Sequence, residues 1–195
     1  MTQRILIMGL PGSGKTTLAD FTQKELAEVG IKAKVVPIPP DKLYTPMPFP
    51  EEFSVAIYLP PRDLFQPELM FEVIRSMPDV KFYLFGDDAK KGESGDNWEH
   101  LGYIDFDEWM PKWSMNLRIT SHDGLPLTPL QFMTAGRNVV TNVPLKGAMV
   151  VEPTREEIIK AIRQGQKKPL SPKVAQYWKK EMDFDKYVKT IRGLI

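Results

Sequence analysis

Apolar and polar positions along the chain follow two different periods, and the two kinds of segment alternate. Short apolar runs have the length of buried strands, and they cover residues 4–8, 34–38, 53–59, 80–85, 101–104, 115–120, 138–141 and 148–151. Apolar residues three or four positions apart predict helices over 16–29, 64–77, 107–113, 129–135 and 154–164, with a further helical segment opened by Ser171. This alternation predicts an α/β fold, with a Rossmann-like, mainly parallel sheet and flanking helices.

Local signals predict where two of these helices begin. Thr154, with Glu157 three positions later, is typical of a capping box, in which the two side chains bond to free backbone N–H groups. Thr128 and Gln131 form a second such pattern, with Pro129 as the first helical residue. We therefore expect a helix N-terminus directly after Thr128.

The composition of the 195-residue chain excludes several classes of protein. A hydrophobic content of 42% is too high for a disordered chain, and 26 Lys and Arg against 25 Asp and Glu exclude the basic excess of a dedicated nucleic-acid binder. Without cysteine there is no disulfide, thiolate-held zinc or thiol nucleophile. No apolar run reaches the about 18 residues of a membrane span and no signal peptide is recognisable, so a cytoplasmic location is expected.

Prolines divide the chain into parts. Six of the 18 prolines lie between residues 37 and 50. Because proline lacks the backbone N–H and fixes φ, this stretch forms neither a central strand nor a helix. We expect a strand–helix–strand unit over 1–38, a proline-rich connector over 39–52, and a Rossmann-like domain over 53–195 that ends in a helical segment.

Charge is less even than the total suggests. Residues 79–109 hold nine acids and three bases, whereas residues 155–195 hold eleven bases and five acids. Three readings stay open: two solvated faces, a basic tail packed on the acidic region, or a surface for an anionic partner.

The first chemical motif lies between a predicted strand and a predicted helix. Gly9-Leu-Pro-Gly-Ser-Gly-Lys15-Thr16 matches the phosphate-binding pattern G-x-x-x-x-G-K-[ST] in full. Its glycines let backbone N–H groups surround a phosphate, Lys15 would neutralise phosphate charge and Thr16 would bind Mg²⁺. The predicted nucleotide-binding residues are Gly9, Gly12, Ser13, Gly14, Lys15, Thr16 and Thr17. Residues 1–35 resemble the P-loop kinases, most of all adenylylsulfate kinases, which implies ATP as ligand with Mg²⁺ at Thr16.

A working kinase of this type needs more than the loop. Asp87 or Asp88, which follow the predicted strand 80–85, are candidates for the second acid that holds Mg²⁺. No arginine-rich lid is recognisable, and the pattern after residue 38 is not that of a kinase. An ATP-dependent small-molecule kinase is therefore kept as an alternative.

A second motif covers residues 120–140, which read Thr-Ser-His-Asp-Gly-Leu-Pro-Leu-Thr-Pro-Leu-Gln-Phe-Met-Thr-Ala-Gly-Arg-Asn-Val-Val. This stretch is similar to the Glu-Gly-x-Pro…Glu-Ala-Met-Ala-x-Gly-x-Pro-Val-Val block of GT-B glycosyltransferases. Residues 35–41, 53–59, 77–86 and 97–104 resemble the domain crossing, the first strand, the second helix–strand step and the strand near the base-binding loop of that family. From about residue 35 to 170, the chain resembles the C-terminal, nucleotide-sugar-binding half of these enzymes.

The resemblance implies a UDP- or GDP-sugar whose diphosphate lies at a helix N-terminus without a metal. The two family glutamates that contact the sugar and the ribose fall on Asp123 and Gln131, and both positions depart from the family. Of the cations that face the leaving diphosphate in the family, only Arg62 is found in the loop after strand 53–59. Asp123 and Arg62 are the expected catalytic residues. The expected ligand contacts are Gly124, Leu125, Pro126, Thr128 and Gln131.

Three functions remain open from the sequence. The first is a glycosyltransferase-like binder of a nucleotide or nucleotide sugar, the second the P-loop kinase, and the third a non-catalytic binding module. A chain of 195 residues holds one donor-type domain and lacks the acceptor domain of a complete GT-B enzyme. A second copy or a partner subunit is therefore expected to close the cleft.

Smaller features have open readings. His122 lies next to the predicted ligand loop, whereas His100 is expected in a loop without a ligand. Aromatic residues are candidates for base stacking or for core packing, namely Trp98, Tyr103, Phe106, Trp109 and Trp113. A C-terminal apolar face is expected to cover the N-terminal unit or to form a subunit interface; it comprises Trp178, Phe184, Tyr187 and Ile191.

Overall fold

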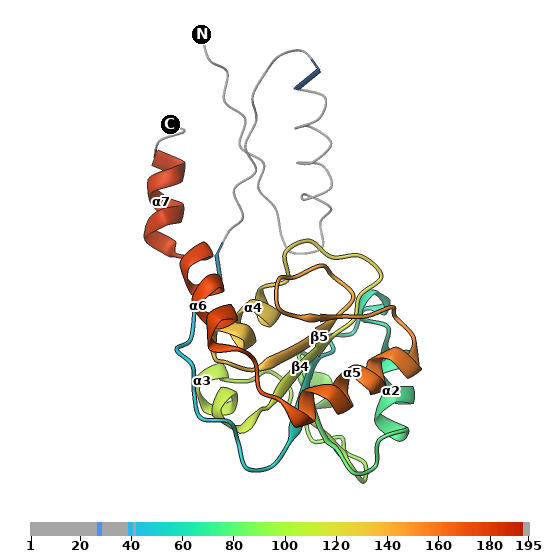
Figure 1. Ribbon diagram of the computed structural model, residues 1–195. Coiled ribbons are helices and arrows are strands. Elements are labelled where there is room, and N and C mark those ends of the chain that lie inside the picture. The colour runs from blue at the N-terminus through green and yellow to red at the C-terminus, as the bar shows by residue number, and fades with distance from the viewer. Residues whose placement is uncertain (1–26, 29–38, 41, 193–195) are drawn as a thin grey trace.

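The computed structural model describes residues 27–28, 39–40 and 42–192, apart from the side chain of residue 191. The predicted phosphate-binding residues Gly9 to Thr17 lie outside the described residues, as does nearly all of the predicted unit over 1–38. Figure 1 shows the described part as one twisted sheet with helices packed around it.

The sheet has six strands, and every neighbouring pair is parallel. The strands are β1 (Ser54–Tyr58), β2 (Lys81–Phe85), β3 (Trp98–His100), β4 (Met115–Arg118), β5 (Asn138–Thr141) and β6 (Met149–Val150). Their order in the sheet is β3-β2-β1-β4-β5-β6, which is the strand order of the doubly wound Rossmann fold. The predicted fold class of this part of the chain is confirmed.

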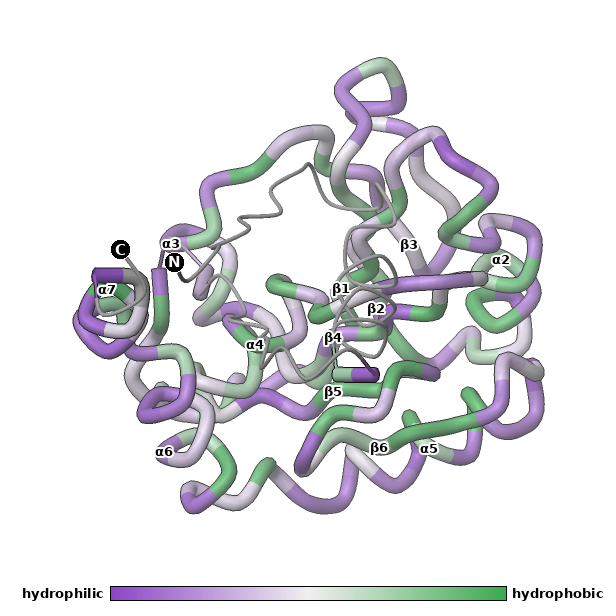
Figure 2. The backbone as a smooth tube through the Cα atoms, turned by 90° about the horizontal axis from the view of Figure 1, so that it is seen from above, coloured by the Kyte–Doolittle hydropathy of each residue, from purple (hydrophilic) through white to green (hydrophobic). Residues whose placement is uncertain are grey.

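Helices cover both faces of the sheet, as all-parallel strands require. They are η1 (Asp63–Phe65), α2 (Pro67–Arg75), η2 (Asp88–Lys90), α3 (Phe106–Trp109), η3 (Met110–Lys112), α4 (Leu127–Thr134), α5 (Arg155–Lys167), α6 (Pro172–Glu181) and α7 (Phe184–Arg192). In Figure 2, α2 and α5 lie on one side of the strands and α4 and α6 on the other. Among the described residues, no helix is long and apolar enough to cross a bilayer.

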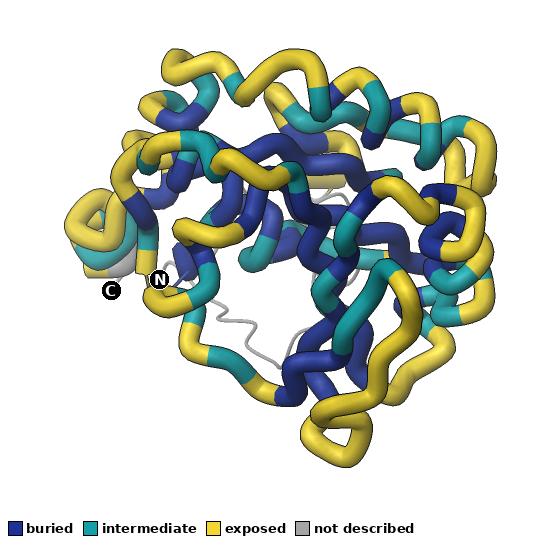
Figure 3. Tube along the Cα trace, turned by 90° about the horizontal axis from the view of Figure 1, so that it is seen from below, coloured by how far each residue is buried: buried dark blue, intermediate teal, exposed yellow. Residues whose placement is uncertain are grey.

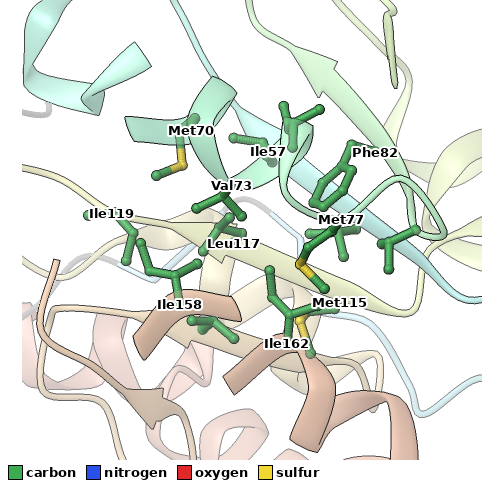
Figure 4. Packing of buried hydrophobic residues seen from close by; sticks show 14 of the residues in the cluster. Ile57, Met70, Val73, Met77, Phe82, Met115, Leu117, Ile119, Ile158 and Ile162 are labelled. Carbon is green, nitrogen blue, oxygen red and sulfur yellow. The ribbon is translucent and has the colours of Figure 1, made fainter. Parts of the chain in front are cut away.

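Aliphatic side chains fill the layer between the sheet and helices α2 and α5 (Figure 4). Val55 and Ile57 of β1 point into this layer because alternate residues of a strand face the same side. Val73 of α2 and Ile162 of α5 meet them, and neither is exposed. Burial of each such side chain contributes about 1.5–3 kcal/mol, and Figure 3 shows the buried residues concentrated along the strands.

The opposite layer contains a cluster of stacked aromatic rings. Trp113 stacks on Phe85 and on Phe132, with ring centroids 5.4 Å apart in both pairs. Trp178 of α6 is buried in the same cluster, and its indole N–H donates to the Lys146 carbonyl at 2.8 Å. Trp113 therefore belongs to the core rather than to a base-stacking surface.

The proline-rich connector is packed on the sheet domain. Its described residues form neither helix nor strand, as predicted. The Tyr44 N–H donates to Thr134 Oγ1 at 3.1 Å, and the Met47 N–H donates to the Ala135 carbonyl at 3.0 Å. These bonds fix the connector against the C-terminal end of α4.

Three predicted boundaries are wrong. The strand expected at 101–104 is Trp98–His100 instead, where β3 pairs with β2. The helix expected at 64–77 is interrupted because Gln66 adopts a left-handed φ of 49°, after which Pro67 starts α2. The predicted cap at Thr128 is absent, since α4 starts at Leu127 with Pro126 as N-cap and no side-chain cap bond. Thr128 and Gln131 are thus helical residues, and Pro129 is not the first helical residue.

The C-terminal basic region has more than one environment. Arg163 of α5 forms a two-pronged ion pair with Asp79, at 2.5 and 2.6 Å, which joins the basic tail to the start of the acidic region. The predicted common apolar face does not form, because Trp178 is buried in the core whereas Phe184 of α7 is 63% exposed. Among the described residues, one exposed ion pair, Arg163–Asp79, links the basic region to the acidic one.

Arg137 is a buried cation at the start of β5. Its side chain is 0% exposed, and among the described residues its one hydrogen bond joins Nη1 to the Met47 carbonyl at 3.3 Å. Nε and Nη2 are buried without a partner, and burial lowers the pKa of the guanidinium from its ordinary value. An unpaired buried charge costs stability.

Replacing Arg137 by methionine is expected to raise the free energy of unfolding by about 1–3 kcal/mol, because the desolvated charge is removed and the apolar volume is kept. Urea denaturation measures the change. Arg75→Met, at an exposed position on α2, is the matched control and should change stability by less than about 0.5 kcal/mol. A clear loss of stability in Arg137→Met would contradict this account.

Candidate functional site

The strand order places a topological switch point between β1 and β4. The chain leaves β1 toward β2 on one side, whereas it leaves β4 toward β5 on the other. The loops after β1 and β4 therefore separate at their carboxyl ends, where doubly wound sheets bind ligands. A hydrogen bond from the Ser121 N–H to the Leu64 carbonyl, at 2.9 Å, ties the two loops together.

Arg118, the last residue of β4, lies at this switch point. Its guanidinium group lies 5.6 Å from the ring centroid of Tyr58 and 5.0 Å from that of Phe65. Its Nε and Nη2 both donate to Asp123 Oδ2, at 2.9 and 2.7 Å. Contact with the rings and a fork of two bonds hold the group in one orientation.

Asp123, a predicted catalytic residue, is the other half of this pair. The side chains of Arg118 and Asp123 are only 9% and 11% exposed. The second carboxylate oxygen, Oδ1, accepts the Gly124 N–H at 2.9 Å. Both oxygens of Asp123 are thus engaged inside the protein, one by a cation and one by the backbone.

Arg62, the other predicted catalytic residue, lies in the loop after β1. It is exposed, its N–H donates to the Pro60 carbonyl, and its carbonyl accepts the Phe65 N–H. Phe65 also contacts the guanidinium of Arg118. Arg62 therefore lies in the loop after β1 and Asp123 in the loop after β4, on the two sides of the switch point.

The predicted ligand loop leads directly into α4. Gly124 and Leu125 are half-buried, and Pro126 is buried at the N-cap position. Leu127 and Thr128 each bring a backbone N–H to the first turn, whereas Pro129 has none. The helix end keeps its partial positive charge, but it offers fewer N–H groups than a start at Pro129 would give.

Gln131 lies one turn inside α4. Its carbonyl accepts the Thr134 hydroxyl at 2.9 Å, which is part of the contact between α4 and the connector. The side chain takes no part in the predicted cap, because the helix begins before it. His122 is exposed beside Asp123, with Nδ1 3.4 Å from Ser121 Oγ.

A separate pocket of about 360 Å³ opens after β3. Tyr103, which is 68% exposed, and Trp109 supply aromatic surface, while Glu99, Asp105 and Glu108 make the pocket acidic. His100 also lines it but is 2% exposed, so the expectation of a loop histidine is wrong and His100 is the buried end of β3. Of the predicted aromatic candidates, Tyr103 and Trp109 face this pocket.

The acids proposed for a magnesium site serve the fold instead. Asp87 caps η2 by accepting the Ala89 N–H at 3.0 Å, and Asp88 accepts the Tyr103 N–H at 2.6 Å. Among the residues that the structure describes, no group of three or more His, Asp or Glu side chains could hold a metal ion. Thr16, the predicted Mg²⁺ ligand, lies outside the described residues.

Sequence reasoning missed Arg118. Within the apolar run 115–120, it was counted only as part of a strand. The available signal was its place at the carboxyl end of a parallel strand, where ligand-binding residues gather. Its ring partners, Tyr58 and Phe65, are far away in sequence, so no local pattern predicts that they cover its guanidinium.

Comparison with known proteins supports the fold. No family model matches the sequence, and no curated protein matches it. Solved structures of glycosyltransferases, however, match its fold. The pneumococcal O-GlcNAc transferase GtfA, solved with UDP and GlcNAc, has a TM-score of 0.61 at 14% identity, over 92% of this chain and 44% of GtfA.

Two further solved structures agree with this result. A GtfA/B complex gives a TM-score of 0.66 at 8% identity, over 95% of this chain and 44% of that one. Sucrose-phosphate synthase from Thermosynechococcus elongatus gives 0.59 at 14% identity, over 88% and 51%. The described domain thus has the fold of the C-terminal half of GT-B glycosyltransferases, and the chain spans about half or less of these proteins.

Gly86 lies against Tyr58, one of the two rings that cover the guanidinium of Arg118. It has a φ of +107°, and a Cβ there would lie 2.5 Å from the Tyr58 ring. Gly86→Ala is expected to lower the free energy of unfolding by about 2–4 kcal/mol, since strain and overlap add. Gly92, with a φ of +87° and open space around it, is the matched control and should cost about 1 kcal/mol as alanine. Equal losses in urea denaturation would show that the Tyr58 contact is unimportant.

His100 makes stability depend on pH. Burial lowers the pKa of its imidazole below the ordinary value, with Asp87 opposing this effect, and Nδ1 accepts the Gly102 N–H at 3.2 Å. The unfolded chain therefore binds the proton more readily, so the free energy of unfolding should fall as pH drops through about 6.5.

Denaturation between about pH 7.5 and 5.5 tests this expectation. His100→Asn keeps an acceptor for Gly102 and should flatten this part of the pH dependence. His122→Asn, at the exposed second histidine, should leave it as in the wild type. If His100→Asn retains the full acid dependence, another group causes it.

Proposed function

We propose that this chain is a glycosyltransferase-like protein that binds the diphosphate of a nucleotide or nucleotide sugar in the switch-point crevice. One observation supports the proposal: at the switch point between β1 and β4, a buried Arg118 is paired with Asp123 in the loop that leads into the N-terminus of α4, and Arg62 lies in the loop after β1. Two cations and a helix N-terminus suit a diphosphate, and none of these groups requires a metal.

The roles of single residues follow the family resemblance. The N–H groups of Leu127 and Thr128 would bond to phosphate oxygens, and Gly124 would let the ligand approach the backbone. Leu125 and Pro126 would line the same loop. The resemblance assigns the position of Asp123 to the sugar, that of Gln131 to the ribose and that of Arg62 to the departing diphosphate.

The pocket after β3 suits the base of the same ligand. It opens at the carboxyl end of a strand in the same sheet, so it shares an edge with the switch point. Tyr103 and Trp109 offer ring faces for stacking, and the pocket carboxylates accept hydrogen bonds from base N–H groups. A nucleotide would then span the edge from β3 to β4.

Transfer of a sugar would need a second domain for the acceptor. The chain covers 44% of GtfA, and GtfA is also found in a GtfA/B complex. We propose that another subunit or a second copy of this chain completes the cleft. Without it, the domain binds the nucleotide and does not catalyse transfer.

The loop Gly9–Thr16 favours a second candidate function. A complete G-x-x-x-x-G-K-T pattern predicts that Lys15 and Thr16 bind Mg·ATP, as in a small-molecule kinase. This prediction is independent of the switch-point crevice and can be separated from it by metal dependence.

Isothermal titration calorimetry with UDP, GDP, a UDP-sugar and ATP, each in EDTA and in Mg²⁺, tests both proposals. We expect a nucleoside diphosphate or its sugar to bind equally well in EDTA. Arg62→Ala should weaken this binding about two- to fivefold, the effect of one exposed cation. Arg75→Ala, which is exposed on α2 away from the crevice, should have no effect.

Two other results would contradict the proposal. Absence of binding to UDP, GDP and the UDP-sugar would overturn the switch-point site. Binding of ATP alone, dependent on Mg²⁺ and lost in Lys15→Ala, would favour the kinase.

A further inference from the structure

Arg118 and Arg62 are the two Lys or Arg residues in the segments that form the crevice, 54–66 and 115–131. Arg62 is exposed and lies next to Asp63 in sequence. Arg118 is nine-tenths buried and fixed at the end of β4. The rigid cation of the crevice is therefore on β4 and not in the loop after β1.

The guanidinium of Arg118 has one nitrogen left for a ligand. Nε and Nη2 are both used by Asp123 Oδ2. Nη1 has no hydrogen bond among the described residues, and it is not one of the buried unpaired atoms, so it keeps some solvent-accessible surface. Tyr58 and Phe65 cover the guanidinium, which leaves this edge as the direction of approach.

Asp123, in contrast to Arg118, has both of its polar atoms occupied within the protein. Oδ2 receives both bonds from Arg118, and Oδ1 receives the Gly124 N–H. Its remaining acceptor capacity is small, since the side chain is 11% exposed. A carboxylate arranged in this way orients its cation and neutralises it before a ligand arrives.

We infer that Arg118 contacts the diphosphate of the ligand through Nη1, and that Asp123 is a positioning residue that holds Arg118 rather than a sugar contact. This inference rests on the proposed nucleotide site and assigns its phosphate selectivity to β4. A planar, always charged guanidinium fixed by its own carboxylate loses little side-chain freedom when an anion binds.

Calorimetry with paired ligands tests the assignment to Arg118. UDP and GDP carry the diphosphate, whereas uridine and guanosine do not. Arg118→Met should weaken binding of the better nucleoside diphosphate at least about tenfold, as expected for loss of a charge-assisted hydrogen bond. Binding of the matching nucleoside should change less than about twofold. Arg118→Lys keeps the charge but loses the fixed fork, and should give an intermediate loss.

The Asp123→Asn variant separates the two roles of this carboxylate. Because the Asn amide oxygen can still accept from Arg118 while the negative charge is gone, the variant should bind UDP or GDP more tightly, and the affinity should fall more steeply with NaCl. If Asp123 contacts the sugar, UDP binding stays unchanged and UDP-sugar binding weakens, which overturns the positioning role. Asp123→Glu should restore affinity and salt dependence toward the wild type.

Folding is controlled separately. Arg118→Met leaves Asp123 buried without its cation, so its melting temperature should fall. The double variant Arg118→Met with Asp123→Asn removes both charges, and it should melt closer to the wild type and still bind the nucleoside diphosphate weakly. A folded double variant that binds UDP or GDP as the wild type does would overturn the role of Arg118.

Failure of the proposed function and failure of this inference give different binding results. A wild-type chain that binds neither UDP nor GDP overturns the proposed function and this inference together. A wild-type chain that binds one of them, while Arg118→Met binds it equally well, overturns the inference alone.

Discussion

The parallel pairing of β1 with β4 is the constraint on which the site depends. The register aligns Val55, Ala56 and Ile57 with Met115, Asn116 and Leu117, so the two strands end side by side. After β1 the chain goes on to β2, and after β4 it goes on to β5, so the two connections run toward opposite edges of the sheet. The carboxyl ends of these two strands are therefore a switch point, the place where doubly wound sheets bind ligands. The side chains that occupy it decide the ligand, and a different set on the same strands would define a different protein.

Two buried arginines show how differently a charge can be accommodated in this fold. Arg118 is paired with Asp123 and covered by two rings, so its charge is balanced where it is desolvated. Arg137 is buried more deeply. Among the described residues its guanidinium has a single hydrogen bond, to a connector carbonyl, and it lies 5.7 Å from the ring centroid of Phe49. The first arrangement gives a fixed cation at the switch point, whereas the second has no counter-ion among the described residues, which costs stability. Burial of a charge is therefore informative only together with its partners.

Much of the fold could be predicted from the sequence, because an apolar run reports burial directly. The apolar run at 138–141 has the same bounds as β5 in the structure. β3 was misplaced, since Trp98-Glu-His contains one apolar residue and reads as a loop, and its strand geometry depends on pairing with β2. The start of α4 was placed two residues too late. Thr128 and Gln131 form a good local capping pattern, but the helix already begins at Leu127, with Pro126 as its N-cap. Asp123 and Arg62 were proposed from their loops and stay predictions, whereas the surroundings of Arg118 depend on contacts between β1, η1 and β4 that no local pattern encodes.

The short outer strands have a consequence for association with other chains. β6 has two residues and β3 has three, and beyond β3 the chain folds back so that Ser94 pairs with Glu99 in an antiparallel bridge. An exposed edge needs a row of free N–H and carbonyl groups to recruit another strand, and long flat edges are the ones that aggregate. Neither border of this sheet presents such a row, so its strands do not serve as a template for continuous sheet growth. Contacts with another subunit would therefore be made by side chains of helices and loops.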